Sequence, residues 1–364
     1  MYGPPPPPSA CRTGRTVYHT SGTAGFSVIR SLQIDKPGLC RFVSRPPAPV
    51  GPGMARLGLR YVGLCGSDLN TFRGLNPLVS LPRTPGHEIG AVVLAVGPGV
   101  DAGLVGAEVT VLPYTSCGTC SSCRKGKVNA CRTNQTLGVQ QEGGLAEELV
   151  LPAEKLMVNP GLPARHLALI EPLSVGFHAI ERGKVAAGDV VAVIGCGMIG
   201  MGAIVAAVAR GARVMAIDPS LPKRAVALKL GARLALDPAA GDVVARIMAE
   251  TGGDGVDLAV EAVGLPATFT QAIDLACFGG RVVYIGYSKQ DVTYDTKLFN
   301  LKELDIMGSR NALIGDFHAA AAFLGRIGSD ADLLISRVFP FALADQALPY
   351  WDGDRDALKI MIAV

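Results

Sequence analysis

The stretch VVAVIGCGMIG at residues 190–200 decides the fold of this chain. Five apolar residues, typical of a buried strand, lead directly into the glycine pattern G-x-G-x-x-G, which opens a predicted helix. Gly195 makes the tight turn, Gly197 lets the backbone approach a pyrophosphate, and Gly200 lets helix and strand pack closely. The helix N-terminus then presents amide hydrogens and positive dipole to phosphates. Alone this pattern is weak evidence, so the surrounding sequence must support it.

The segments that follow repeat the same order of strand and helix. The next apolar strand, at 214–217, ends at Asp218, where a carboxylate can accept the ribose hydroxyls of NAD and repel the 2′-phosphate of NADP. The nearby Lys223 and Arg224 are interpreted as solvated helix charges rather than phosphate contacts. Further strands are expected at 256–260 and 282–287. We therefore predict an α/β fold with a Rossmann doubly wound parallel sheet at residues 173–309, and NAD as its cofactor.

The residues before Pro172 have a different pattern. Short apolar or alternating segments separated by Gly and Pro are typical of a small barrel-like β domain, and they occur at 56–62, 89–96, 109–113 and 146–151. After residue 309 the pattern predicts a helix around 317–326 and a last apolar strand at 359–362. We predict that residues 31–172 and 310–364 form this second domain.

Composition excludes several classes of protein. The chain has 364 residues, enough for two domains, and a formal net charge of +3. Arg12, Arg15 and Arg30 account for that charge, so no clustered basic excess suggests a nucleic-acid surface. No apolar run approaches the roughly 18 to 20 residues of a membrane span. We expect a cytoplasmic protein that binds neither nucleic acid nor membrane.

The first 30 residues are unlike the rest of the chain. They contain the proline run Pro4–Pro8, no acidic residue and no apolar signal core. Proline runs favour extended conformations that bury little surface, and this segment lacks the amphipathic period of an organelle-targeting leader. We predict that residues 1–30 are a disordered extension or the product of a misassigned start codon.

A loop rich in Gly, Ser and Lys carries the pattern C-x2-C-x2-C-x7-C. Its members are Cys117, Cys120, Cys123 and Cys131. Four thiolates this close can complete a tetrahedral zinc shell, which leaves no open position for a substrate. Iron–sulfur clusters also take four thiolates, and disulfides are the other alternative, which the lack of a secretion signal disfavours. We predict a structural zinc that pins the loop.

A second set of candidate ligands is dispersed along the chain. Cys65 lies in GLCGSD (63–68), His87 and Glu88 lie in PGHE (85–88), and Glu171 begins EPLSVGFH (171–178). A lone Cys or His is more often core filling than a ligand. Together with the four-cysteine loop and GCGMIG, however, these motifs occur in an order that resembles the zinc-containing medium-chain alcohol dehydrogenase superfamily. The resemblance is to its sorbitol and threonine dehydrogenase branch and covers about residues 31–364.

The resemblance implies a GroES-like β-barrel catalytic domain beside the Rossmann domain. It implies that Cys65 and His87 bind a catalytic zinc together with Glu171, which stands where ethanol-oxidising relatives have cysteine and polyol dehydrogenases have glutamate. Glu88 would be a neighbouring or exchanging ligand. Three protein ligands leave the open position that catalytic zinc needs. One sulfur, one nitrogen and one carboxylate make a harder shell than two thiolates, which favours substrates with several hydroxyls.

Further residues follow from the same resemblance. Ser67 matches the family's proton-accepting Ser or Thr, but Asn70 stands where many relatives carry a histidine. Asparagine cannot titrate, so the route by which the proton leaves stays open. Arg310 follows the last expected strand of the Rossmann sheet, where its fork suits the carboxylate of a sugar acid such as an aldonate, or the cofactor. Arg73 is a second candidate for contact with an anion.

The predicted function is therefore that of a zinc-dependent oxidoreductase. It would transfer hydride from a secondary alcohol of a polyol, sugar or sugar acid to NAD, with two zinc ions per chain. The alternatives are an L-threonine 3-dehydrogenase, a simple secondary alcohol dehydrogenase, and a non-catalytic NAD-binding protein. The resemblance also implies a homodimer or homotetramer, paired near 292–294 and 304–307. The predicted cofactor contacts are Gly195, Gly197, Met198, Ile199, Gly200, Asp218, Val263, Ile285 and Arg310.

Overall fold

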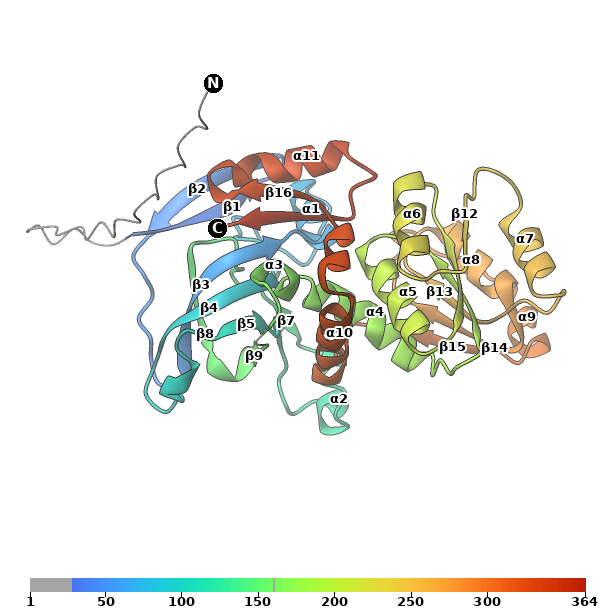
Figure 1. Ribbon diagram of the computed structural model, residues 1–364, viewed down its shortest axis with the longest axis horizontal. Coiled ribbons are helices and arrows are strands. Elements are labelled where there is room, and N and C mark those ends of the chain that lie inside the picture. The colour runs from blue at the N-terminus through green and yellow to red at the C-terminus, as the bar shows by residue number, and fades with distance from the viewer. Residues whose placement is uncertain (1–27, 160) are drawn as a thin grey trace, which may run out of the picture.

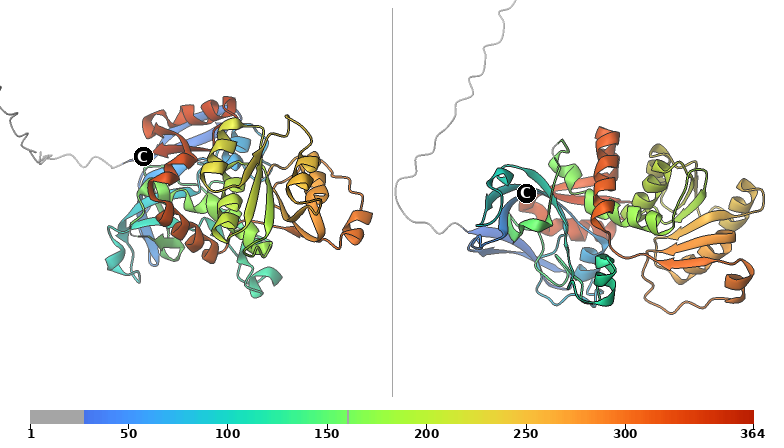
Figure 2. Two further views of the ribbon diagram at one scale, coloured as in Figure 1. Left: turned by 45° about the vertical axis from the view of Figure 1, so that its right-hand side comes forward. Right: turned by 90° about the horizontal axis from the view of Figure 1, so that it is seen from below.

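The computed structural model describes residues 28–159 and 161–364, so most of the predicted extension lies outside the described residues. The first strand, β1 (Ile29–Lys36), begins inside the range predicted as extension, because Ile29 is buried and pairs with Arg45. Figure 1 shows two lobes, a β-rich lobe that holds the C-terminus and a lobe of strands flanked by helices. The two further views in Figure 2 show the same separation. In the described part of the chain, no helix is long and apolar enough to cross a membrane.

A seven-stranded sheet organises the β-rich lobe, with the order β16-β17-β3-β4-β5-β9 and with β8 also paired to β3. Its long strands β3 and β4 run antiparallel, and their alternating residues fill the core, as the sequence pattern predicts. β1 pairs with β2 in a separate hairpin. The strands are β2 (Leu39–Arg45), β3 (Met54–Gly63), β4 (Glu88–Val96), β5 (Glu108–Val111), β6 (Tyr114–Thr115), β7 (Gln135–Thr136), β8 (Glu148–Pro152), β9 (Leu156–Val158), β16 (Ile335–Pro340) and β17 (Lys359–Ala363).

The second lobe contains a six-stranded parallel sheet in the order β12-β11-β10-β13-β14-β15. This is the predicted Rossmann sheet, and the predicted fold class is confirmed. The strand expected at 282–287 instead spans 276–284, because Ile285 and Gly286 turn their amides to the Glu261 carbonyl. The strands are β10 (Val190–Ile194), β11 (Arg213–Ile217), β12 (Leu234–Leu236), β13 (Val256–Glu261), β14 (Ala276–Tyr284) and β15 (Asp305–Gly308).

Helices flank the parallel sheet and connect the lobes. α4 and α10 lie between the two lobes in Figure 1, and α5, α6 and α8 lie in the lobe of the parallel sheet. The helices are α1 (Gly66–Phe72), α2 (Ser121–Arg124), α3 (Ala164–Leu167), α4 (Ile170–Arg182), α5 (Met198–Ala209), α6 (Leu221–Lys229), α7 (Val243–Glu250), α8 (Pro266–Leu275), α9 (Lys297–Leu301), α10 (Ile314–Ile327) and α11 (Ala347–Gly353).

Two glycines let α4 and α5 approach each other closely. A Cβ atom on Gly176 of α4 would lie 2.2 Å from the Ala203 amide nitrogen of α5. A Cβ atom on Gly202 of α5 would lie 2.7 Å from the Leu173 carbonyl oxygen of α4. Atoms cannot pack at such distances, so neither position has room for a side chain. The backbones of the two helices are therefore in direct contact.

Candidate active site and zinc centres

The ends of β3 and β4 bring three of the predicted ligands together. Cys65 follows β3 as the N-cap of α1, while His87 precedes β4 and Glu88 is its first residue. Since the strands are antiparallel and Gly63 pairs with Glu88, residues next to this pair meet at one edge of the sheet. One donor atom from each of Cys65, His87 and Glu88 lies within 4.8 Å of the others. We call these three residues, with Glu171, the mixed-ligand cluster.

Asp68 holds the two loops of this cluster in place. Its Oδ2 accepts a hydrogen bond of 2.8 Å from the Cys65 amide, and its Oδ1 accepts one of 3.4 Å from the Gly86 amide. Asp68 is buried. Charge-assisted bonds to backbone amides are among the stronger ones in proteins, so Asp68 fixes Cys65 relative to the loop before His87.

Glu171 reaches the cluster from the first turn of α4. It is buried, and its Oε1 accepts a hydrogen bond from the phenol of Tyr114. It is not among the three residues whose donor atoms lie within 4.8 Å of one another. Burial and then the charge of Glu171 raise the pKa of Tyr114 well above its ordinary value, so the phenol stays protonated and donates.

Glu88 has a different partner, the buried Lys359 of β17. The lysine Nζ lies 2.6 Å from each carboxylate oxygen and donates to the Leu64 carbonyl at 2.9 Å. The two side chains are only 1% and 2% exposed. A Cβ atom on Gly63 would lie 2.0 Å from Glu88 Oε2, so the absence of a side chain there makes room for the carboxylate. Burial raises the pKa of Glu88 and Glu171 adds to this, while Lys359 and His87 oppose it.

The surroundings of His87 suit a cation. Burial lowers its pKa, but the charge and hydrogen bond of Cys65 and the charges of Glu171 and Asp68 outweigh burial and hold the pKa well above its ordinary value. Within the described residues, His87 Nδ1 is buried without a hydrogen-bond partner. Buried polar atoms are rarely unpaired. Sulfur, imidazole and carboxylate donors are those that zinc takes, so this cluster fits a zinc ion.

Ser67 and Arg73, the candidates for proton transfer and anion contact near Cys65, have different surroundings, as does Asn70. Ser67 Oγ is buried and lacks a partner among the residues described, so it is available to a bound molecule. Asn70 lies on the same helix, and its carbonyl accepts a hydrogen bond from the Leu75 amide. Arg73 forms an ion pair of 2.5 Å with Asp352 of α11, so its charge is already compensated.

The four cysteines of the loop also meet, as a second group of donors within 4.8 Å of one another. The Sγ atoms of Cys120 and Cys123 are 3.5 Å apart and those of Cys117 and Cys131 are 3.6 Å apart, too far for the roughly 2.05 Å bond of a disulfide. A hydrogen bond from Thr119 lowers the pKa of Cys117 to about 6, and one from Ser122 lowers that of Cys120 to about 5. Burial raises the pKa of Cys123 to about 11, so its thiol would lose its proton only as a metal ion binds. Four sulfurs within 4.8 Å of one another, two of them with a lowered pKa, fit zinc.

The glycine motif lies between β10 and α5, as predicted. Gly195 has a φ of +94°, and a Cβ atom there would meet the Val263 side chain at 2.7 Å. A Cβ atom on Gly200 would lie 1.8 Å from the Gly195 carbonyl oxygen. At Gly197, by contrast, nothing lies within 4 Å, so the start of the helix is open to an approaching phosphate. The backbone fits a dinucleotide. Met198 and Ile199, the other predicted contacts, begin α5.

Asp218 directly follows β11 and faces the glycine motif. Its carboxylate accepts hydrogen bonds of 2.8 Å from the amides of Cys196 and Ser220. The interpretation of Arg224 as a solvated charge is wrong: its side chain is 13% exposed and pairs with Asp237 at 3.0 Å, because β12 passes alongside it. Lys223 donates to the Arg355 carbonyl. Arg224 also donates to the carbonyls of Asp218 and Pro219 at 2.6 and 2.8 Å, so its charge lies beside Asp218 and is shared with Asp237.

The remaining predicted cofactor residues lie at strand ends. Val263 follows β13 and is 44% exposed, whereas Ile285 follows β14 and is buried. The loop at Val263 is held by the buried Glu261, whose Oε1 accepts hydrogen bonds from the Val263 and Gly264 amides. Arg310 is exposed, and its guanidinium donates to the Cys131 carbonyl at 3.4 Å.

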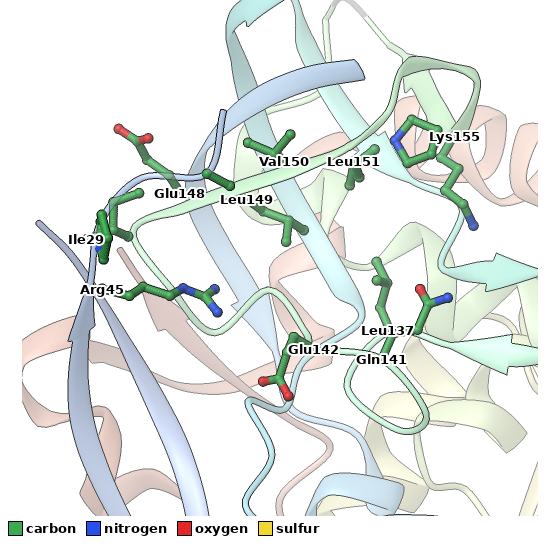
Figure 3. A pocket seen from close by; sticks show the side chains of 13 residues that line it. Ile29, Arg45, Leu137, Gln141, Glu142, Glu148, Leu149, Val150, Leu151 and Lys155 are labelled. Atoms are coloured by element: carbon green, nitrogen blue, oxygen red, sulfur yellow. The ribbon is translucent and has the colours of Figure 1, made fainter. Parts of the chain in front are cut away.

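A pocket beside β8 is separate from these sites (Figure 3). Arg45, Glu142, Glu148 and Lys155 are among its lining residues. None of the predicted zinc, proton-transfer or cofactor residues lines it. We therefore assign no part of the reaction to this pocket.

The residues that escaped the sequence prediction include Tyr114, Glu261 and Lys359. Lys359 had a detectable signal, since a lysine inside an otherwise apolar strand implies a buried partner. Glu261 had a weaker one, an acid at the end of an apolar strand. Tyr114 precedes the four-cysteine loop with no signal in its spacing.

Comparison with known proteins places the chain in a family. Residues 51–161 match the model of the alcohol dehydrogenase GroES-like domain, and residues 199–326 match that of zinc-binding dehydrogenase. L-galactonate-5-dehydrogenase of Escherichia coli K12 is 35% identical over 297 residues, covering 81% of this chain and 87% of that protein.

Solved structures agree with this placement. The RspB protein of Escherichia coli CFT073, complexed with NADH, has a TM-score of 0.86 at 29% identity and covers 93% of this chain and all of its own. A protein from Sinorhizobium meliloti 1021, bound to NADP, has a TM-score of 0.85 at 29% identity with the same coverage. The motif order, the two-lobed fold and these likenesses agree, and the chain belongs to the zinc-containing medium-chain alcohol dehydrogenase family.

Proposed function

We propose that this protein oxidises a secondary alcohol of a polyol or sugar acid with NAD, using a zinc ion held by Cys65, His87 and Glu171. The observation that carries the proposal is the group of unlike donors around His87, which lies within 4.8 Å of Cys65 and Glu88 and has the buried Glu171 and the unpartnered Ser67 hydroxyl nearby. When bound, zinc makes an alcohol more acidic and nicotinamide accepts hydride. The likeness to L-galactonate-5-dehydrogenase supports a sugar acid as substrate.

Glu171, rather than Glu88, is the carboxylate ligand in this proposal. Glu88 is neutralised by Lys359, which lies 2.6 Å from both its oxygens, and an ammonium so close competes with any metal ion. The partner of Glu171 is a neutral phenol that bonds to Oε1, so Oε2 would be free to hold a zinc ion. A hydrogen bond from the phenol also orients the ligand, as second-shell groups of metal sites do.

Three further residues take part in the proposed reaction or hold the site in place. Ser67 Oγ accepts the proton of the substrate hydroxyl and releases its own proton to water. It lies two residues after Cys65 and is buried without another partner among the described residues. Asp68 holds the loop of Cys65 against the loop before His87 by accepting hydrogen bonds from both. Arg310, exposed beyond the last Rossmann strand, supplies the charge for a substrate carboxylate or for the cofactor.

The cofactor in this proposal is NAD rather than NADP. Asp218 faces the glycine motif with a negative charge, and the neighbouring Arg224 is already paired with Asp237. A carboxylate in this position repels a 2′-phosphate. Asp218→Ala should weaken NAD binding about tenfold or more, since hydrogen bonds to a charged group contribute about 1.5–3 kcal/mol. Titration of the wild type and variant with NAD and NADP measures this, and a wild type that prefers NADP contradicts the role of Asp218.

A substrate screen tests the reaction. Purified protein with zinc is supplied with NAD and with polyols, hexonates, L-threonine or simple secondary alcohols, and NADH formation is followed by absorbance. We expect turnover with hexonates or polyols and much less with simple alcohols. Turnover with L-threonine alone moves the protein to the threonine dehydrogenase alternative. NADH binding without turnover of any substrate, in protein that holds two zinc ions per chain, contradicts the proposal.

The protein is proposed to form a homodimer or homotetramer through the edge of its parallel sheet. β15 is an edge strand, and the exposed apolar side chains of Ile306, Phe278 and Leu301 lie on it or on neighbouring segments. An unpaired strand edge with apolar neighbours is a template for pairing with a second chain. Light scattering of the protein measures its oligomeric state, and a monomer at micromolar concentration contradicts this part of the proposal.

A further inference from the structure

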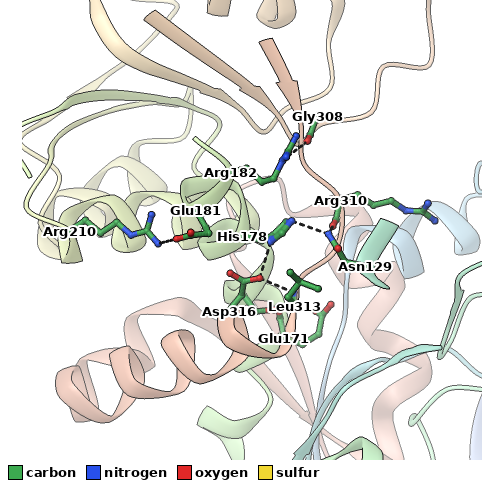
Figure 4. A network of polar contacts seen from close by, with 11 residues as sticks. Asn129, Glu171, His178, Glu181, Arg182, Arg210, Gly308, Arg310, Leu313 and Asp316 are labelled. Atoms are coloured by element: carbon green, nitrogen blue, oxygen red, sulfur yellow. Dashed lines mark hydrogen bonds and ion pairs between the residues drawn. The ribbon is translucent and has the colours of Figure 1, made fainter. Parts of the chain in front are cut away.

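Three buried side chains connect the four-cysteine loop to α4 and α10, the two helices that lie between the lobes (Figure 4). Asn129 lies in a short turn immediately before Cys131, His178 lies on α4, and Asp316 lies in the first turn of α10. His178 Nδ1 is 2.9 Å from Asp316 Oδ2, and its Nε2 is 2.9 Å from Asn129 Nδ2. None of the three is more than 8% exposed, so their polar atoms need partners within the protein.

The direction of each bond follows from the partners. The Asn129 amide nitrogen can only donate, and its two contacts are His178 Nε2 and the Arg310 carbonyl at 2.8 Å, both acceptors. The ring proton of His178 is therefore on Nδ1, from which it is donated to Asp316. Asp316 Oδ2 also accepts from the Leu313 amide at 2.8 Å, which fixes the start of α10.

These bonds determine the path of the chain where it returns from the Rossmann domain. Residues 309–313 have no helix or strand, so their backbone groups need other partners. The loop supplies one of them, because the Asn129 side chain donates to the Arg310 carbonyl. The side chains of Arg310 and Asn311 tie the segment to the loop in the other direction, donating to the Cys131 carbonyl at 3.4 Å and to the Asn129 carbonyl at 3.3 Å. Asn311 has a φ of +50°, a constrained conformation that these contacts help to hold.

We propose that Asn129, His178 and Asp316 are positioning residues that couple the four-cysteine loop to binding of the nicotinamide cofactor. The segment they fix directly follows β15 and carries Arg310, so its position sets the geometry on one side of the cofactor site. A metal ion in the loop holds Asn129 in place, whereas a loop without metal must order Asn129 at an entropic cost. This inference rests on the proposed NAD function. Thermodynamic linkage then requires that cofactor binding raise the affinity of the loop for its metal ion by the same factor by which that metal ion raises cofactor affinity.

Asn129→Ala tests the coupling, with Asn134→Ala as a matched control. Asn134 lies just beyond the same four cysteines but donates to the nearby Thr136 hydroxyl. We expect Asn129→Ala to weaken NADH binding about fivefold or more in a fluorescence titration, and the control to leave it nearly unchanged. Release of loop zinc to a chromogenic chelator should be slowed by NADH in the wild type and in the control. In Asn129→Ala that protection should disappear.

Asn311→Gly covers the case in which Asn129→Ala does not fold. Glycine adopts a φ of +50° readily, so the variant causes no backbone strain. It removes only the hydrogen bond from the Asn311 side chain to the Asn129 carbonyl of the four-cysteine loop. It should reduce NADH affinity and the protection of loop zinc in the same direction. If the folded variants lose thermal stability but keep the NADH affinity and the zinc protection of the wild type, the network is merely structural and the proposal is wrong. If the wild type itself binds no NADH, the proposed function fails first, and the coupling with it.

Discussion

The two groups of candidate metal ligands in this molecule differ in donor type, in sequence separation and in burial. The four cysteines of the loop are identical donors close together in sequence, held by short turns and partly exposed. The mixed-ligand cluster draws unlike donors from the loop after β3, the start of β4 and the first turn of α4 into a largely buried site with its own charged partners. A uniform shell is closed and serves the fold, whereas a mixed shell with extra carboxylates and an unpartnered hydroxyl is suited to chemistry.

The largest expected effect separates the two groups directly. Cys65→Ser should lower turnover by about 10³-fold or more, because an alcohol loses the acidity that zinc confers. It should leave one zinc per chain and a nearly unchanged unfolding temperature. Cys123→Ser, in the loop, should instead lower the unfolding temperature and retain the zinc of the mixed-ligand cluster. Metal analysis, calorimetry and kinetics of the two variants decide this, and equal effects on stability contradict the comparison.

Ser67→Ala tests whether the unpartnered hydroxyl takes part in proton transfer. Turnover should fall by about 10²- to 10⁴-fold, the usual contribution of a positioned proton acceptor. Ser67→Thr keeps a hydroxyl and should retain most of the activity. NADH affinity, measured in parallel, should not change in either variant. A Ser67→Ala enzyme within about fivefold of wild-type turnover would falsify the role of Ser67.

Lys359→Ala tests the buried ion pair that distinguishes the mixed-ligand cluster from the loop. The change leaves the Glu88 carboxylate buried without its counter-charge, which costs about 3–5 kcal/mol of unfolding free energy. Lys359→Ala combined with Glu88→Gln removes both charges and should recover part of that loss. Urea denaturation of the single and double variants measures the free energies. A single variant that loses less than about 1 kcal/mol shows that the pair is not important for stability.

The smallest expected effect concerns the phenol that bonds to Glu171. Tyr114→Phe keeps the ring but removes the hydroxyl, so zinc affinity at the mixed-ligand cluster should fall about 10- to 100-fold, as when other second-shell partners are removed. Competition with a chelator measures the affinity, and Cys123→Ser protein identifies which zinc is released. Unchanged affinity in Tyr114→Phe contradicts Glu171 as the ligand that Tyr114 orients.

The sequence predicted features that are local or periodic. The glycine motif, the strands around it and the four-cysteine spacing each place their residues within one short segment, so the Rossmann fold was predictable from the residues. The mixed-ligand cluster needed the resemblance, because nothing in a single motif brings Cys65, His87 and Glu171 together. The buried pair of Glu88 and Lys359 lies 271 positions apart, and no local pattern specifies such a partner. Arg224 was misjudged for the same reason, since its partner Asp237 lies beyond the helix that carries it.

The contact between Gly176 and Gly202 has a consequence for the reaction itself. α4 carries Glu171 in its first turn and α5 begins at the glycine motif. In the proposed function, the spacing of these helices would therefore set how far a zinc ion held by Glu171 lies from the cofactor. Hydride transfer requires reacting atoms about 3–3.5 Å apart, and a displacement of about 1 Å can cost about 10²-fold in rate. A methyl group at either glycine would force the helices apart by a comparable amount. Through the spacing of the two helices, these glycines would therefore control the distance over which the hydride is transferred.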